Sequence, residues 1–287
     1  MHYKEYKTIL STKNRMNIYR GCSHGCIYCD SRSKCYQMTH GFEDIEVKKD
    51  VVHLLEMELR KKRKKAMIST GAMSDPYIHI ENDLEITREC LKVIDNYGFG
   101  LSILTKSNRI LRDMDVLKSI NENSKCVVQV TLTTFDDMLC KELEPNVSVT
   151  SERIEVLKKM SYEDIPTIVW LGPILPFIND SEENLIGLLN YCIEAKVKGI
   201  LSFAFGVTLR EGNREYFYNQ LDRKFPNIKK EYIKNYGNSY VCSCKNYKTL
   251  NKIFIETCEK HNIMYKTKDI FDYLEKYEEK DRQISFF

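Results

Sequence analysis

The sequence lacks a strong excess of charge of either sign. Its 44 basic and 41 acidic residues give a formal net charge of only +3, so no global field indicates a nucleic acid or a membrane as partner. It also lacks a run of about 18 apolar residues, the length of a membrane-spanning helix; the longest candidate, residues 165–178, contains three prolines and a glycine. The first ten residues have no continuous hydrophobic stretch of the kind found in signal peptides. These absences predict a soluble, cytoplasmic protein.

Apolar residues and cysteines are plentiful, whereas glycine-rich phosphate loops and Ser-His-Asp arrangements are absent. Hydrophobic residues make up 43% of the 287 positions, which is enough for one large domain or one domain with a small appendage. The eleven cysteines are an odd number in a chain too long to need disulfides, so a cluster of them indicates metal or redox chemistry in a reducing cytosol. Eight are scattered, and we expect most of these to be small buried hydrophobic residues.

Apolar, β-branched runs alternate with amphipathic stretches along the first 206 residues. Six strands are predicted: near 15–20, then 66–70, 100–105, 126–133, 166–171 and 199–205. Five helices are predicted between them: 47–65, 83–97, 109–121, 150–160 and 182–196. Such alternation is typical of an α/β fold with a parallel sheet covered by helices. Six units favour an open, partial (β/α)6 barrel of the TIM type, and a doubly wound sheet is the alternative. In both folds the active site lies at the carboxyl ends of the strands.

The alternation stops after the sixth strand. Residues 207–287 contain a polar, Tyr-rich stretch and helical patterns near 249–261 and 269–281. We therefore expect a barrel over 1–206 and a C-terminal helical extension over 207–287 that caps it and ends in a flexible tail.

Three cysteines, Cys22, Cys26 and Cys29, have the spacing C-x3-C-x2-C. Three thiolates on a short loop can hold three irons of a [4Fe–4S] cluster and leave the fourth iron open to a small molecule. Two alternatives need a fourth ligand: a zinc site completed by Cys35 or His24, and an electron-transfer cluster completed by Cys35. Cys35 follows at an awkward spacing, so the open cluster is favoured.

The motif resembles that of the radical S-adenosylmethionine (SAM) superfamily, and the surrounding sequence is similar to its spore photoproduct lyase-like branch, also called DNA repair photolyase-like. The resemblance extends over roughly residues 15–260. It rests on these segments: Asn17-Ile-Tyr-Arg-Gly-Cys22-Ser-His-Gly-Cys26-Ile-Tyr28-Cys29, Thr70-Gly-Ala-Met-Ser-Asp-Pro-Tyr77, Leu104-Thr-Lys106, Leu143-Glu-Pro145 and Tyr236-Gly-Asn-Ser-Tyr-Val-Cys242.

The resemblance implies that the three cysteines bind a [4Fe–4S] cluster and that five other residues bind SAM. It places Tyr28 near the adenine, Ser74 and Asp75 at hydrogen-bonding positions, Lys106 at the methionine carboxylate, and Thr131 where the lyase has a serine. A cation for the carboxylate and polar partners for the ribose suit these groups at strand ends. The alternatives are a solvated Lys106 and helix-capping roles for Ser74 and Asp75.

The same resemblance implies an enzyme that cleaves SAM reductively to a 5′-deoxyadenosyl radical, with electrons from an external flavodoxin- or ferredoxin-type donor and damaged DNA as a substrate. The lyase has a reactive cysteine in a segment Ala-Cys-Thr-Ser-Asp, whereas the corresponding segment here, Gly71-Ala72-Met73-Ser74-Asp75, contains no cysteine. Cys242 or Cys244 is the candidate substitute as hydrogen-atom donor. Modification of RNA or peptide remains an alternative, as does a non-catalytic iron–sulfur or zinc protein.

Two further segments concern partners. Arg60–Lys65 consists of six consecutive cations. One interpretation is a helix C-terminus, where the helix dipole favours cations. The other is a contact with the phosphates of a nucleic acid. The last five residues, Gln283–Phe287, resemble the peptide with which bacterial repair proteins bind the DNA sliding clamp. Packing of this tail on the protein itself is the alternative.

Overall fold

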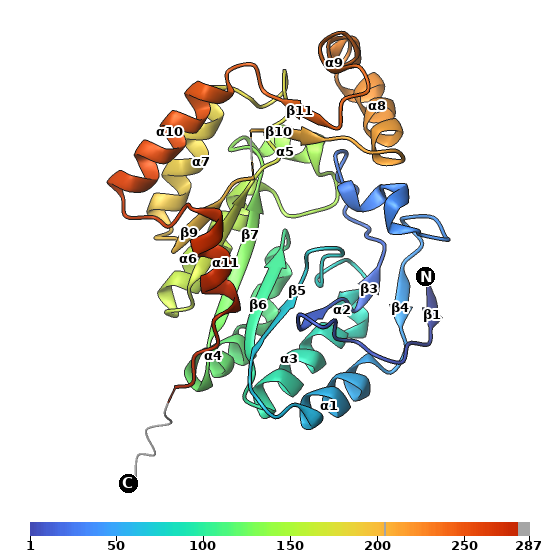
Figure 1. Ribbon diagram of the computed structural model, residues 1–287, viewed down its shortest axis with the longest axis vertical. Coiled ribbons are helices and arrows are strands. Elements are labelled where there is room, and N and C mark those ends of the chain that lie inside the picture. The colour runs from blue at the N-terminus through green and yellow to red at the C-terminus, as the bar shows by residue number, and fades with distance from the viewer. Residues whose placement is uncertain (204, 281–287) are drawn as a thin grey trace.

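The computed structural model describes residues 1–203 and 205–280, and these form a central parallel sheet of six strands in the order β2-β5-β6-β7-β8-β9. Figure 1 shows this curved, open sheet with helices along its outer side. The strands are β2 (Arg15–Met16), β5 (Met67–Thr70), β6 (Gly100–Thr105), β7 (Cys126–Leu132), β8 (Thr167–Leu171) and β9 (Gly199–Leu201). The order follows the chain, as in consecutive right-handed βαβ units. The prediction of a partial (β/α)6 barrel is confirmed.

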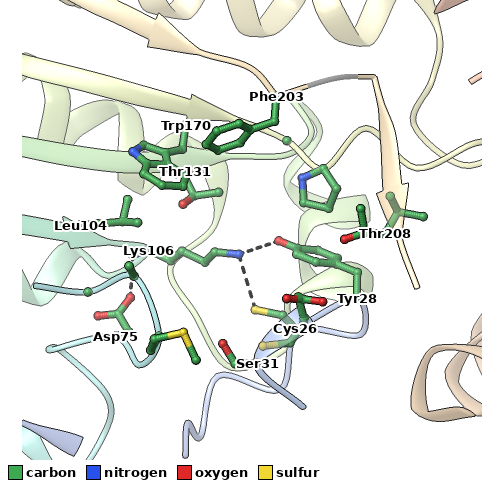
Figure 2. Close-up of a pocket in the computed structure, with 18 of the residues that line it drawn as sticks. Cys26, Tyr28, Ser31, Asp75, Leu104, Lys106, Thr131, Trp170, Phe203 and Thr208 are labelled. Carbon is green, nitrogen blue, oxygen red and sulfur yellow. Dashed lines mark hydrogen bonds between the residues drawn. The ribbon is translucent and has the colours of Figure 1, made fainter. Parts of the chain in front are cut away.

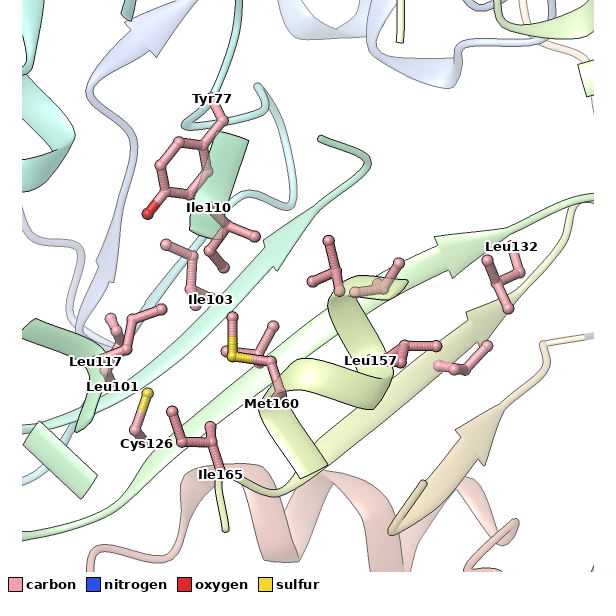
Figure 3. Close-up of a cluster of buried hydrophobic side chains, with 14 of the residues drawn as sticks. Tyr77, Leu101, Ile103, Ile110, Leu117, Cys126, Leu132, Leu157, Met160 and Ile165 are labelled. Carbon is pink, nitrogen blue, oxygen red and sulfur yellow. The ribbon is translucent and has the colours of Figure 1, made fainter. Parts of the chain in front are cut away.

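The longer helices between the strands cover the outer face of the sheet. They are α1 (Val51–Lys61), α3 (Ile86–Asn96), α4 (Met114–Asn123), α6 (Thr150–Tyr162) and α7 (Glu182–Glu194), with the short α2 (Glu81–Leu84) and η3 (Asn108–Asp113) between them. α5 (Asp137–Leu143) packs instead with the cysteine loop (residues 22–29). Leu101 and Ile103 of β6 and Val128 of β7 point toward this layer and are fully buried. Figure 3 shows part of the resulting core, where Leu157 and Met160 of α6 lie over the sheet.

The inner, concave face carries the alternate residues of the same strands, because successive side chains of a strand point to opposite faces. Met67, Val127 and Ile168 form a second apolar cluster there, together with Ile270 and Leu274 of α11 (Thr267–Glu275). An open barrel would leave this face in contact with water. The C-terminal helix covers it instead.

Smaller elements surround the sheet. They are β1 (His2–Lys4), β3 (Tyr19–Arg20) and β4 (Glu46–Lys48) in one sheet, β10 (Gly206–Thr208) and β11 (Val241–Ser243) in an antiparallel pair, the short helices η1 (Asp30–Arg32) and η2 (Lys34–Tyr36), and the helices α8 (Asn213–Lys224), α9 (Ile228–Tyr236) and α10 (Tyr247–Lys260). Within the described residues, no helix combines the length and apolar character needed to cross a bilayer.

Several predicted boundaries were wrong. The strand expected near 15–20 is two short strands in different sheets, the strand expected over 199–205 ends at Leu201, and the helix expected from residue 47 is preceded by β4. The extension, expected to be helices and loops, also contains the β10–β11 pair. Each error involves a short strand of two or three residues, too short to show a periodic pattern. The division at residues 206 and 207 stays a prediction.

Candidate active site

A cavity of about 540 Å³ opens at the carboxyl ends of the central strands. One wall comes from the residues at the ends of β5 to β9, and the opposite wall from the cysteine loop and the β10–β11 pair. Figure 2 shows Lys106 reaching across this space toward Tyr28 and Cys26. Active sites of parallel α/β folds occupy this end of the sheet.

Cys22, Cys26 and Cys29 all line the cavity, on the loop that joins β3 to η1. The loop turns tightly at Gly21, where φ is +91° and an added Cβ would lie 2.5 Å from the carbonyl oxygen of Phe42. All three thiols are free, and Cys22 and Cys26 are buried. Three free thiols converging on one cavity are the donor set that an open [4Fe–4S] cluster requires.

The two residues considered as a fourth ligand lie differently. Cys35 is exposed, contacts the guanidinium of Arg210 at 3.2 Å, and is not among the described residues that line the cavity. His24 lines the cavity and is buried; its Nδ1 lies 3.5 Å from Asp75 Oδ2, and its Nε2 has no hydrogen-bond partner in the described part of the chain. Burial lowers the pKa of His24 to about 4.

Lys106 follows β6 and joins a buried ionic network. Its Nζ donates to Tyr28 OH at 2.6 Å and to Glu144 Oε1 at 2.7 Å, and lies 3.7 Å from Cys26 Sγ. The other carboxylate oxygen of Glu144 accepts a hydrogen bond of 2.5 Å from Arg153. Burial alone would raise the pKa of Glu144, but Arg153 and Lys106 outweigh it and hold this pKa below its usual range. Glu144 and Arg153 were not predicted, although Leu143-Glu-Pro145 belonged to the recognised segments.

Asp75 holds the end of β6 in place. Its carboxylate accepts hydrogen bonds of 2.8 Å each from the hydroxyl of Thr105 and from the amides of Lys106 and Tyr77. Asp75 therefore lines the cavity and also positions Lys106 through its backbone. Gly71 makes the turn before it possible, because φ is +100° and an added Cβ would lie 1.9 Å from the Leu104 carbonyl oxygen.

The other predicted residues divide into two groups. Tyr28 and Thr131 line the cavity, whereas the hydroxyl of Ser74 donates to the Gly21 carbonyl at 2.5 Å and supports the cysteine loop. Cys242 and Cys244 are buried, with Sγ atoms near the carbonyls of Ser239 and Ile174, and neither is among the described lining residues. The structure thus does not bring these two thiols to the cavity, because Cys242 of β11 and Cys244 just after it are both buried in the protein interior.

An aromatic wall lies opposite the cysteine loop. Phe203 is 64% exposed and packs edge-on against Trp170, with ring centroids 5.5 Å apart. On its other side it approaches Phe271 of α11 at 6.3 Å. Trp170 is fixed by its Nε1, which donates to Gln129 at 2.7 Å. The sequence alone does not predict this wall, because Phe203 and Phe271 are 68 positions apart in the chain.

A family model described as the radical SAM superfamily matches residues 16–189, more than half of the chain. An uncharacterized protein of Methanocaldococcus jannaschii is 35% identical over 176 residues, which are 61% of this chain and 65% of that protein. An uncharacterized protein of Mycobacterium tuberculosis is 28% identical over 232 residues, which are 77% of this chain and 66% of that protein. The chain thus matches just under two thirds of the length of these relatives.

Among solved structures, spore photoproduct lyase complexed with dinucleoside spore photoproduct superposes with a TM-score of 0.61 at 14% sequence identity. The match covers 86% of this chain and 74% of the lyase chain. A double mutant of that lyase with bound AdoMet and dinucleoside spore photoproduct superposes with a TM-score of 0.60. At this identity the likeness shows a shared fold.

Proposed function

This chain belongs to the radical SAM superfamily, and from that premise we propose that it acts by radical chemistry on a damaged DNA base held in the cavity. Members of the superfamily bind a [4Fe–4S] cluster and SAM and take electrons from an external donor. The observation that carries the proposal is the convergence of Cys22, Cys26 and Cys29 on one cavity, beside the ammonium of Lys106.

The residues of this chain would bind the cluster, orient SAM and shield the cavity from water. The three thiols would hold the cluster, and Lys106 would bind the carboxylate of SAM through a charge-assisted hydrogen bond. When bound, the cluster and SAM supply a 5′-deoxyadenosyl radical that removes a hydrogen atom from the substrate. Glu144 keeps Lys106 charged and oriented, Arg153 holds Glu144 in place, and Asp75 fixes the backbone from which Lys106 extends. The β10–β11 pair, which lines the cavity, limits access of water to it.

Two features support a nucleobase as substrate. The lyase with a similar fold is complexed with a dinucleoside photoproduct, and Phe203 presents an exposed aromatic ring to the cavity. Aromatic rings bind bases by stacking, worth roughly 1–3 kcal/mol for each base. The segment Gly71–Asp75 lacks the reactive cysteine that the lyase has in its corresponding segment, so we propose a DNA substrate but not the lyase's own reaction. A thymine lesion is the first candidate.

The test uses protein reconstituted with iron and sulfide without oxygen, then reduced and mixed with SAM. Oligonucleotides with defined lesions, RNA and peptides, each deuterated, are screened for transfer of deuterium into 5′-deoxyadenosine. We expect transfer from a lesion-bearing DNA. Transfer from RNA or peptide alone would replace DNA by that substrate class. Failure to form any 5′-deoxyadenosine would favour the non-catalytic iron–sulfur or zinc protein.

Two sets of variants sharpen the test. Alanine at Cys22, Cys26 or Cys29 should abolish iron binding, whereas Cys35→Ala should retain about four irons per chain; equal loss with Cys35→Ala would indicate a four-thiolate site. Phe203→Ala should lower DNA-dependent SAM cleavage about tenfold and leave cleavage without substrate unchanged. Ile186→Ala, at an exposed position of α7, is the matched control.

A flavodoxin- or ferredoxin-type protein is the proposed electron donor. Clamp binding is proposed for Gln283–Phe287, which lie outside the described residues.

A further inference from the structure

Two histidines and two carboxylates meet where β1 pairs with β4, next to the N-terminus in Figure 1. His2 and Glu46 are register partners in this parallel pair, and His40 and Asp44 come from the segment that leads into β4. His2 Nε2 lies 3.8 Å and His40 Nε2 lies 3.7 Å from the same atom, Glu46 Oε2. The two imidazole rings meet edge to face, with centroids 4.8 Å apart.

The hydrogen bonds of the two histidines determine which ring nitrogen carries a lone pair and turns it toward Glu46. His40 Nδ1 lies 3.0 Å from the Gly41 carbonyl, and His2 Nδ1 lies 3.0 Å from Asp44 Oδ2. A carbonyl and a carboxylate accept hydrogen bonds, so both Nδ1 atoms must donate. In each neutral ring, Nε2 is then an acceptor that faces another acceptor.

Acceptors that face one another in this way are stabilised by a proton or a metal cation that lies between them. Glu46 is only 1% exposed, and His40 Nε2 is buried without a hydrogen-bond partner among the described residues. A buried acceptor without a partner costs stability. Imidazole Nε2 atoms whose Nδ1–H groups donate to a carbonyl or a carboxylate have the orientation of metal ligands in proteins.

We propose that His2, His40 and Glu46 bind a divalent transition-metal ion, with zinc as the best fit. Zinc takes imidazole nitrogens and carboxylate oxygens at about 2.0–2.2 Å in tetrahedral sites, which places the ligand atoms about 3.4 Å from one another. The observed separations from Glu46 Oε2 are 3.7 and 3.8 Å, and ligand atoms of His2, His40 and Asp44 lie within 4.8 Å of one another. Asp44 would orient His2 and add a compensating negative charge.

Three other polar groups contact the carboxylates. Lys4 Nζ lies 3.2 Å from Glu46 Oε2, Tyr6 donates to Glu46 Oε1 at 2.5 Å, and the amino group of Met1 lies 2.8 Å from Asp44. Tyr6 uses the oxygen that the metal does not need. Lys4 is 48% exposed, so its ammonium can move into water when the metal takes its place.

The site would brace the segment that supports the cysteine loop. Residues 40–46 include Phe42, whose carbonyl accepts the amide of Cys22 at 3.1 Å and lies against Gly21. A metal joining His2 to His40 would tie β1 to this segment. Its role is structural, separate from the cluster and from SAM.

The experiment measures zinc and iron together. Protein without a histidine tag and with its cluster reconstituted is incubated with a tenfold excess of zinc sulfate, passed through a desalting column, and analysed by elemental mass spectrometry. We expect about one zinc for each chain in addition to the iron. Zinc should also raise Tm, because the ion binds the folded state.

His40→Ala and His2→Ala should each lose the zinc and its effect on Tm, while the iron content stays unchanged. His53→Ala, at an exposed position of α1, should keep both metals. His2 is partly exposed at the edge of the fold, so its variant tests the site even if His40→Ala folds poorly. Wild-type protein without retained zinc, or folded histidine variants that retain it, would overturn the proposal.

Discussion

Lys106 connects the cysteine loop with the strand-end wall, because its ammonium contacts Tyr28 and lies near Cys26 while its backbone amide is held by Asp75. An ammonium has three donors, and two of them are used by Tyr28 and Glu144. The third donor lies toward Cys26 Sγ at 3.7 Å. We expect a ligand carboxylate to replace this long contact, because the contacts with Tyr28 and Glu144 use the other two donors.

Lys106→Ala should therefore weaken SAM binding while leaving the iron content unchanged. Loss of a charge-assisted hydrogen bond costs roughly 1.5–3 kcal/mol, equivalent to a ten- to hundredfold rise in Kd. Equilibrium dialysis with labelled SAM measures the effect, and Lys92→Ala on the surface of α3 is the control. Equal affinity in wild type and Lys106→Ala would place the SAM carboxylate elsewhere.

Glu144→Gln should destabilise the protein. Glu144 is buried between two cations, Lys106 and Arg153, and removal of its charge leaves both without compensation. Breaking a buried ion pair by changing one partner costs about 3–5 kcal/mol. Urea unfolding of the reconstituted protein measures the loss, and Glu142→Gln, which removes an exposed pair with Lys224, should change stability by less than about 1 kcal/mol. A similar change in both variants would show that the network is not stabilising.

At the scale of single residues, the sequence predicted the site residues that belong to a local motif. It did not predict the site residues that meet only through tertiary contacts. Cys22, Cys26 and Cys29 have a fixed spacing, and the resemblance located Lys106. Glu144 is 38 positions from Lys106 and nine from Arg153, so nothing local shows that the three charges meet. Cys242 and Cys244 were predicted from their segment alone, and the facing of β11 could not be read from three residues.

Among the secondary-structure elements, α11 does most to complete the barrel. The six strands leave the concave face open, and Ile270 and Leu274 cover it by packing on Met67, Val127 and Ile168. Phe271 on the same helix supports Phe203 in the cavity wall. The helix thus links the stability of the barrel to the shape of the site.

Ile270→Ala should lower the free energy of unfolding by about 2–5 kcal/mol, the usual cost of such a truncation in a packed core. Ile270 is fully buried, whereas Ile233 on α9 is 51% exposed, so Ile233→Ala is the matched control. Urea denaturation followed by circular dichroism measures both. Near-equal stabilities would mean that α11 does not stabilise the barrel.

The long elements were predicted well because each carries a full period of its pattern. β6 has the predicted bounds, and α7 starts at the predicted residue. The packing of α11 inside the barrel was not predicted, since an amphipathic helix shows that it has an apolar face but not which surface that face covers.

For the whole molecule, the proposed clamp peptide and the enzyme site are separate parts of the chain. Deleting residues 283–287 should abolish binding to a bacterial sliding clamp, measured by calorimetry at the micromolar affinity typical of a short peptide with few anchors. Iron content and SAM cleavage should not change, because the described residues that line the cavity lie within residues 22–241. If the shortened protein still bound the clamp, the C-terminal tail would not be the segment that contacts it.

The basic run and the cavity lie at opposite ends of the barrel. Arg60–Lys65 joins the end of α1 to the start of β5, whereas the cavity lies at the carboxyl ends of the strands (Figure 1). Within the run, Lys62 donates to Asn14 at 2.6 Å and Lys65 donates to the carbonyl of Tyr97. These two lysines thus bind neighbouring segments, while Arg60 and Lys61 lie in the last turn of α1, where the helix dipole favours cations.

Reversing charge at the exposed positions Arg63 and Lys64 should therefore leave DNA binding unchanged. A cation that contacts a phosphate adds about 0.9 to the slope of log affinity against log salt, so two lost contacts would lower that slope by nearly two. Fluorescence anisotropy over a range of salt concentrations measures it. Lys34→Glu is the positive comparison, because Lys34 is 70% exposed in η2 and lies two residues from Tyr36 in the cavity wall. We expect Lys34→Glu to lower the slope by about one; a drop only in the Arg63→Glu/Lys64→Glu variant would move the DNA contact to the opposite end of the barrel.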